Sequence, residues 1–156
     1  MREFDHSLSI EAPASRVIDA FFDAADLAAW WHVSRSLCHP RTLGSYALEW
    51  PTTDAADDVL GRLGGAFHGT VIEFKAGREF LVADAYWLPP DGEPIGPMAL
   101  EASCTTLGER VLLRVRQSGW EKSPRWTRYY ERLAANLTGS LNELKGYVES
   151  RRVRVH

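Results

Sequence analysis

Hydrophobic and polar positions follow three different periods along the chain, and the changes of period divide it into three parts. In FDHSLSIEA, at positions 4–12, apolar and polar side chains alternate, as is typical of a half-buried β-strand. Pro13 follows at a position that suits the first turn of a helix, where the missing N–H costs nothing. The segments SRVIDAFFDA and LAAWW then predict two short helices, with Asp26 as the N-cap of the second.

The middle part, from about residue 35 to residue 118, has a period of two. Its alternating segments are TLGSYALEW, AFHGTVIEF, EFLVADAYWL, MALEASCTTL and RVLLRVRQS. Turns rich in glycine and proline separate them, which predicts an antiparallel meander. The stretches 51–65 and 89–97 are polar and read as long loops.

The last third changes to helical spacing. Apolar residues recur at steps of three and four from Pro124 to about Arg151, namely Trp126, Tyr130, Leu133, Leu137, Leu141, Leu144 and Val148. This pattern predicts one long amphipathic helix, with Ser123 and Pro124 as its start. Segregated strands and helices indicate the α+β class, with the long helix in the concave side of a curved sheet. We expect a single domain over residues 1–150 and a basic tail, frayed and solvated, over 151–156.

Composition narrows the functional classes. The chain has 156 residues, 45% of them hydrophobic, with a net charge of −3, so it has the material for one core but no basic surface for nucleic acid. It lacks a run of about 20 apolar residues that would span a membrane. Two cysteines are too few for a disulfide scaffold, and the N-terminus is charged where a signal peptide is apolar. These features favour a reduced, cytoplasmic protein.

Four stretches together resemble a known family. They are IEAPASRVIDAFFDAADLAAWW at 10–31, GTVIEF at 69–74, RVLLRVRQSGW at 110–120 and YYERLAANLTGSLNELKGYVE at 129–149. In this order they are similar to the START-like (SRPBCC) superfamily, and within it to bacterial homologues of the C-terminal domain of the activator of the heat-shock-protein ATPase. The resemblance covers essentially the whole chain.

The resemblance implies a helix-grip fold of the START/Bet v type. In this fold a curved antiparallel sheet wraps around a long C-terminal helix, with two short helices after the first strand. Members of the superfamily bind apolar small molecules between sheet and helix. The stretches 51–64 and 89–97 depart from the usual pattern; each either shapes the mouth of a cavity or is a plain surface loop.

Three functions are compatible with these observations. The first is a binding protein for an apolar or aromatic ligand. The second is a co-chaperone-like protein-interaction module, which is supported only by the resemblance to the activator of the heat-shock-protein ATPase. The third is a cyclase- or hydrolase-type enzyme for an aromatic or polyketide-like substrate, with Asp84, His68 or His6 as acid or base. The sequence shows no recognisable set of catalytic residues, so we rank binding above catalysis and expect no cofactor. An exposed Trp30 or an open sheet edge would favour a homodimer.

Aromatic residues supply most of the candidate site, because bulky rings and a few polar groups are what a small-molecule pocket needs. The predicted ligand-binding residues are Trp31, Tyr46, Leu48, Trp50, Tyr86, Cys104, Trp120, Tyr130, Leu133 and Leu137. Asn136 or Tyr130 is the candidate polar handle. Of the pair Trp30–Trp31, we expect Trp31 to face the cavity, although the reverse assignment fits the helical spacing equally well.

Other chemical signals are weak. Cys104 shares an apolar strand face and reads as a small buried hydrophobe unless a histidine lies in reach. His32, Cys38 and His39 are close in sequence but lack the spacing of a metal site. Asp84 lies in the predicted strand EFLVADAYW. If the face of this strand that carries Asp84 points toward the core, the carboxylate is buried; if the other face does, the carboxylate is solvated. We favour the solvated position.

Overall fold

The computed structural model describes residues 2–154 of the chain. The elements, in chain order, are β1 (Phe4–Ile10), α1 (Ala14–Asp19), α2 (Ala24–Trp31), β2 (Arg35–Cys38), β3 (Ser45–Trp50), β4 (Ala56–Asp57), β5 (Gly61–Arg62), β6 (Gly65–Lys75), β7 (Glu79–Leu88), β8 (Ile95–Leu107), β9 (Arg110–Ser118) and α3 (Pro124–Arg154). The predicted order of one strand, two helices, a run of strands and a long helix is confirmed.

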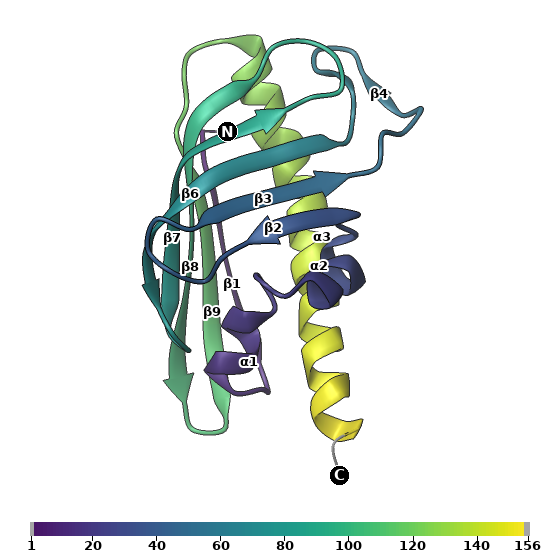
Figure 1. The fold of residues 1–156 in the computed structure, drawn as a ribbon. Helices are drawn as coiled ribbons and strands as arrows, with labels where there is room; N and C mark the ends of the chain where they lie inside the picture. The colour runs from purple at the N-terminus through teal and green to yellow at the C-terminus, as the bar shows by residue number, and fades with distance from the viewer. Residues whose placement is uncertain (1, 155–156) are drawn as a thin grey trace.

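Seven strands form one antiparallel sheet in the order β1-β9-β8-β7-β6-β3-β2. Figure 1 shows it as a curved wall, with the small β4–β5 hairpin projecting from one end. That hairpin lies inside the polar stretch 51–65, which the sequence presented as a loop. The other predicted loop, 89–97, is shorter than expected because β8 already begins at Ile95.

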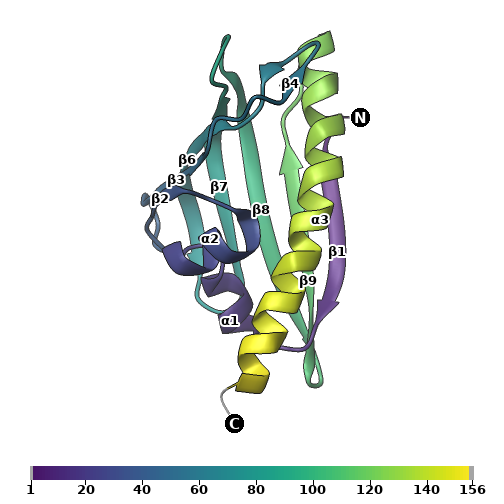
Figure 2. The ribbon, with the colours of Figure 1, turned by 90° about the vertical axis from the view of Figure 1, so that its right-hand side faces the viewer.

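The helix α3 lies along the open side of this wall, as Figure 2 shows, and contacts α2 and β1. Its apolar stripe faces the sheet: Leu137, Leu141, Leu144 and Val148 are all at most 2% exposed. The start at Ser123 is confirmed, since the Ser123 hydroxyl accepts a hydrogen bond from the Trp126 N–H at 3.3 Å. This arrangement is the predicted helix-grip fold.

The beginning of α2 differs from the prediction. Asp23, and not Asp26, is the N-cap, and its carboxylate accepts the Asp26 N–H at 3.0 Å. Asp26 lies in the first turn and is 5% exposed, with both its oxygens bonded by the Arg16 guanidinium. Two aspartates three residues apart match an N-cap pattern equally well, and the tertiary contact to α1 decides between them.

A β-bulge in β7 resolves which face of this strand points inward. The register with β8 shifts between Val82 and Ala85, and Asp84 adopts φ +50°. The inward set is therefore Phe80 and Val82 before the bulge, and Ala85 and Trp87 after it. Before the bulge the even-numbered residues of β7 point inward, and after it the odd-numbered ones do. Asp84 is exposed, as predicted from the sequence.

The core between α1, α2 and the sheet is filled with aromatic rings. Phe22 lies 4.9 Å from Phe80 and 5.3 Å from Tyr46, measured between ring centroids. Phe21 contacts Trp30 edge-on at 5.1 Å. Polar atoms of the cluster are satisfied by backbone, because the Trp30 Nε1–H donates to the Ala20 carbonyl and the Tyr46 hydroxyl to the Phe21 carbonyl. We call these five residues the aromatic core.

The C-terminal end of α3 reaches Arg154, three residues beyond the predicted end. The backbone of the expected basic tail is thus helical up to that point, where fraying was expected. The remainder of the tail, residues 155–156, lies outside the described residues. No helix in the described part of the chain is long and apolar enough to cross a membrane.

Candidate functional site: a cavity between sheet and helix

A cavity of about 500 Å³ lies between the first half of α3, the end of α2 and the sheet. The strands contribute the ends that lie farthest from α1, and the segment containing β4 and β5 closes one side. The lining residues are Trp31, His32, Trp50, Pro51, Thr53, Leu60, Leu63, Gly64, Phe67, Trp87, Gln117, Tyr129, Arg132, Leu133, Asn136, Leu137 and Ser140. Most of this surface is apolar, as in small-molecule sites of similar size.

The neighbours Trp30 and Trp31 divide between the aromatic core and the cavity. Trp30 is fully buried, whereas Trp31 is half-buried and lines the cavity. Their rings nevertheless stack, with centroids 4.8 Å apart and an angle of 15° between planes. The rigid Trp30 therefore supports Trp31 at the cavity wall, in the orientation expected for the pair.

Two further tryptophans present apolar ring surface because their N–H groups are already bonded. The Trp50 Nε1–H donates to the Trp31 carbonyl at 2.9 Å, and its ring meets the Trp31 ring edge-on at 5.5 Å. The Trp87 Nε1–H donates to the Gly64 carbonyl at 2.8 Å. These bonds fix the rings while leaving their hydrocarbon surface available to an occupant of the cavity.

The segment 51–64 closes one side of the cavity. Leu60, which is 4% exposed, and Leu63 turn their side chains into the cavity. The stretch 51–64 therefore takes the first of the two roles left open for it, as part of a cavity wall. No residue of 89–97 belongs to the lining; there Asp91 instead binds Arg62 through two hydrogen bonds of 2.7 and 3.0 Å.

Asp57 holds this segment to α3. Its side chain is fully buried and accepts the backbone N–H groups of Val59 and Leu60 at 2.9 and 3.0 Å. It also accepts Nε–H donors from Arg128 at 2.7 Å and Arg132 at 2.8 Å. Burial by itself would raise the pKa of Asp57, but the two N–H groups and the two guanidinium groups outweigh it and hold that pKa well below its usual range.

Only two polar residues of the described lining are more than nine-tenths buried. They are Gln117, 3% exposed, and Tyr129, 7% exposed. The Gln117 Nε2–H donates to the Tyr129 hydroxyl at 2.7 Å, and the Tyr129 ring lies 5.6 Å from the Trp87 ring. Burial raises the pKa of Tyr129 far above its ordinary value, so its hydroxyl is neutral at physiological pH. The other polar lining groups, including Asn136 and His32, lie at the more exposed rim.

Four of the ten predicted site residues line the cavity: Trp31, Trp50, Leu133 and Leu137. The other six lie elsewhere. Tyr46 and Leu48 are buried on β3, with Tyr46 in the aromatic core, and the Tyr130 hydroxyl is bonded to the Gly119 carbonyl at 2.7 Å. Whether the four contact a ligand stays a prediction.

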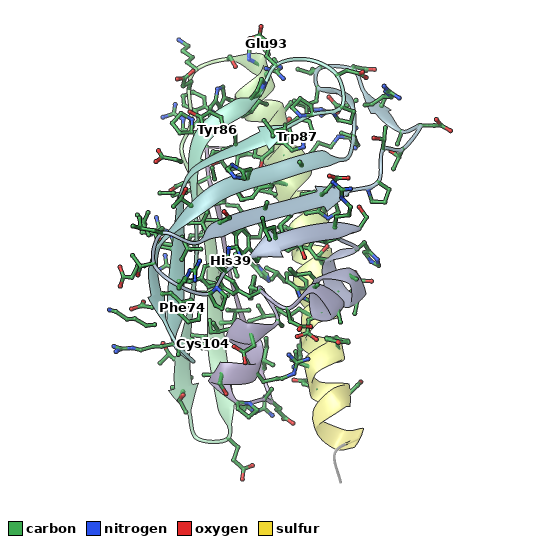
Figure 3. The ribbon with its side chains drawn as sticks, viewed as in Figure 1. His39, Phe74, Tyr86, Trp87, Glu93 and Cys104 are labelled. Atoms are coloured by element: carbon green, nitrogen blue, oxygen red, sulfur yellow. The ribbon has the colours of Figure 1, made fainter. Side chains whose placement is uncertain are left out.

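Three of the six residues outside the cavity lie on the other side of the sheet, beyond the end of a strand or far from the cavity. Tyr86 is 38% exposed because it follows the bulge, and Figure 3 shows it on the opposite side of β7 from Trp87. Trp120 lies beyond β9, where the Arg2 guanidinium stacks over its ring at 4.7 Å. Cys104 is half-buried near the far end of β8, and burial raises its pKa to about 11, so the thiol is neutral at physiological pH.

Sequence reasoning missed the polar pair Gln117 and Tyr129. The signal for Gln117 was present, because it continues the inward series Val111, Leu113 and Val115 at a step of two. A polar residue at the fourth inward position, after three apolar ones, breaks the pattern and is therefore a candidate functional residue. Tyr129 gave no comparable signal, since it lies beside the predicted helical stripe and not on it.

Comparison with known proteins identifies the fold but not the family. Protein MLL2253 from Mesorhizobium loti is similar over 96% of this chain and 98% of its own, with a TM-score of 0.72 at 15% identity. The Aha1 dimer from Colwellia psychrerythraea is similar over 96% and 97%, with a TM-score of 0.65 at 15% identity. DynU16, from the dynemicin biosynthetic locus, gives a TM-score of 0.64 at 19% identity over 96% of this chain and 48% of its own.

No family model matches the sequence, and no curated protein matches it either. The likeness to these structures concerns the backbone, because their sequence identities are low. Together with the curved sheet and the long C-terminal helix, it defines the chain as a protein with the helix-grip fold.

Proposed function

We propose that the protein binds an apolar, aromatic small molecule in the cavity between the sheet and α3. The observation that carries this proposal is the cavity of about 500 Å³, lined by Trp31, Trp50, Phe67 and Trp87. Ligand sites of roughly 300–1,000 Å³ with such walls enclose drug-sized molecules. Flat aromatic ligands are the best match, since they stack on or meet the edges of indole rings.

The walls are held apart by specific bonds, which supports a cavity with a role. The side chains of Trp50 and Trp87 are anchored to backbone carbonyls, and Asp57 ties the segment 51–64 to α3. Unfilled space between apolar side chains lowers stability. A fold that fills its aromatic core yet fixes an opening beside it gains from an occupant that restores the missing contacts.

A titration with matched variants tests the proposal. The probes are a panel of fatty acids, flavonoids and aromatic polyketides, with affinity measured by isothermal titration calorimetry. Leu133→Trp places a larger side chain in the cavity, whereas Leu112→Trp adds the same group on the outer face of β9, where Leu112 is 38% exposed. We expect binding of at least one aromatic compound that Leu133→Trp abolishes and Leu112→Trp retains. Equal affinity in both variants, or no binding by any compound, would contradict the proposal.

We also propose that the chain forms a homodimer through the edge strand β2. This strand ends the sheet, and Leu37 on it is 57% exposed. A sheet edge offers free backbone groups that a second copy can pair with, and the similar Aha1 structure is described as a dimer. In sedimentation analysis, Leu37→Lys should yield a monomer, while Leu107→Lys, at a residue 59% exposed in another part of the sheet, should not. A monomeric wild-type protein would refute this arrangement.

A further inference from the structure

The polar pair Gln117–Tyr129 is buried in a part of the cavity wall that is otherwise apolar. Gln117 occupies the position where β9 would place a fourth inward apolar residue after Val115. Leucine or methionine there would fill the same space without a buried amide. A buried polar group costs stability unless it is fully hydrogen-bonded, so the pair needs an explanation beyond packing.

The hydrogen-bonding capacity of the pair is only partly used within the protein. The Gln117 Nε2 donates to the Tyr129 hydroxyl oxygen at 2.7 Å and lies 3.4 Å from the Met98 sulfur. A glutamine amide also has a carbonyl acceptor, and a tyrosine hydroxyl has a proton to donate. In the part of the chain that the structure describes, no group donates to Gln117 Oε1 and none accepts the Tyr129 proton.

The two unused groups complement each other. One is an acceptor and the other a donor, and the Gln117–Tyr129 bond holds them side by side. Because Oε1 and Nε2 belong to the same small planar amide, a single oxygen atom of a ligand can reach both Oε1 and the tyrosine hydroxyl. Such an atom must accept one hydrogen bond and donate one.

We propose that Gln117 and Tyr129 select, among aromatic ligands, those that carry a neutral hydroxyl group; this inference rests on the proposed function of the cavity. The ligand hydroxyl accepts the proton of the Tyr129 hydroxyl and donates its own to Gln117 Oε1. The hydrocarbon part of the ligand then lies against Trp87 and Phe67. Gln117 and Tyr129 are thereby specificity-determining residues, and the ligand class is a phenol or an aromatic alcohol.

The surroundings favour a neutral group over an ion. Two lining residues can carry charge: Arg132 is held by Asp57 at 2.8 Å, and His32 lies at the exposed rim, 3.1 Å from a carboxylate oxygen of Glu143. Around the polar pair lie Met98, Trp87 and Tyr130, which bring no formal charge. An ion buried among them would lose its hydration without a partner of opposite charge. A hydroxyl makes the two hydrogen bonds at much smaller cost.

A pair of nearly isosteric probes tests the inference. 2-Naphthol and 2-methylnaphthalene share the same ring system and differ only in a hydroxyl or methyl group. Dissociation constants come from titrations followed by heteronuclear NMR, in which the side-chain amide of Gln117 is observed directly. We expect wild-type protein to bind 2-naphthol at least about tenfold more tightly than 2-methylnaphthalene, because the methyl compound leaves both protein groups unpaired.

Two conservative variants assign this preference to the pair. Gln117→Leu and Tyr129→Phe each remove one of the two hydrogen bonds to the ligand hydroxyl, so in each the ratio of the two dissociation constants should fall. In the double variant it should fall to about one, while the affinity for 2-methylnaphthalene stays the same or rises. Leu112→Trp, on the outer face, should keep the wild-type ratio. The wild-type ratio is informative even if one variant fails to fold.

The outcomes distinguish the role of Gln117 and Tyr129 from the ligand-binding function of the cavity. Equal binding of both probes by wild-type protein, or an unchanged preference in both variants, would overturn the role of Gln117 and Tyr129 and leave the cavity function standing. No binding of either probe, together with no binding in the wider panel, would overturn both.

Discussion

The two halves of the space enclosed by sheet and helix are built from the same kinds of residue and yet differ in filling. On the side of α1, the five aromatic side chains of the aromatic core pack against one another, and Phe21, Trp30 and Tyr46 have no exposed surface. On the side of β4 and β5, five aromatic rings, those of Trp31, Trp50, Phe67, Trp87 and Tyr129, line a cavity of about 500 Å³. Aromatic content therefore does not distinguish a core from a site; what differs is whether polar anchors hold the rings together or apart.

Trp30 and Trp31 mark the border between these halves. The rings stack at 4.8 Å, so the filled half supports a wall of the open half. The Trp30 Nε1–H is bonded to the Ala20 carbonyl, whereas the Trp31 backbone carbonyl accepts the Trp50 Nε1–H. One dipeptide thus contributes a core residue, a cavity residue and the backbone anchor of another cavity residue.

The largest difference between the halves should appear when one α3 leucine is truncated in each. Leu144 is fully buried, whereas Leu133 is half-buried at the cavity. Leu144→Ala should lower the free energy of unfolding by about 2–5 kcal/mol, as for other core leucines. Leu133→Ala should lower it by only about 1 kcal/mol, because less apolar surface returns to water. Urea unfolding of both variants measures the contrast, and equal losses would mean that the cavity side is packed like the core.

A smaller effect should follow from releasing the cavity wall. Asp57→Asn removes the charge that Arg128 and Arg132 share, so it should lower the unfolding temperature at pH 7 and weaken aromatic ligand binding. Asp91→Asn is the matched control: its ion pair with Arg62 is half exposed on both sides, and such pairs contribute little. Thermal unfolding with and without ligand measures both effects. Equal behaviour of the two variants would show that Asp57 does not fix the wall.

The pH dependence of this difference has a definite sign. The pKa of Asp57 is held below its ordinary value of 3.8 in the folded protein. Its stabilising contribution is therefore fully present above that value and is lost as the pH falls below about 4, toward the lower folded pKa. The gap in unfolding temperature between wild type and Asp57→Asn should be constant from pH 5 to pH 7 and narrow below pH 4. A gap that widens on acidification would contradict the ionised state of Asp57.

The smallest effect on stability should come from the residues most important for selectivity. The double variant Gln117→Leu/Tyr129→Phe replaces both partners of a buried hydrogen bond with apolar groups, and such exchanges are close to neutral or stabilising. Its free energy of unfolding should differ from wild type by no more than about 1 kcal/mol, or should rise. A loss as large as that of Leu144→Ala would assign the pair to the fold and not to the ligand.

The fold could be predicted from the sequence because its signals are long and periodic. The α3 stripe, from Trp126 to Val148, repeats over about six turns, and the strand alternation continues through most of the middle part. The resemblance to START-like proteins rested on the same segments. Small errors arose where two local signals were equivalent, as with Asp23 and Asp26, between which only the contact with Arg16 decides.

The site could be predicted only in part because it depends on where periodicity breaks. The bulge at Asp84 shifts the inward face of β7, which moves Tyr86 outward and Trp87 into the cavity wall. A single residue with φ +50° has no clear signature in an alternating strand. In addition, all aromatic positions looked equal in sequence, while tertiary packing placed Tyr46 in the aromatic core and Trp50 at the cavity.

The six tryptophans provide the most direct test of a binding cavity. Trp31, Trp50 and Trp87 line it, whereas Trp120 and Trp126 do not, and Trp30 lies behind Trp31. In a heteronuclear NMR spectrum, each indole N–H gives its own signal. On addition of 2-naphthol, we predict saturable shifts of the Trp31, Trp50 and Trp87 signals, with those of Trp120 and Trp126 unchanged. Uniform shifts across all six, or none at saturating 2-naphthol, would contradict the assignment of this cavity as the binding site.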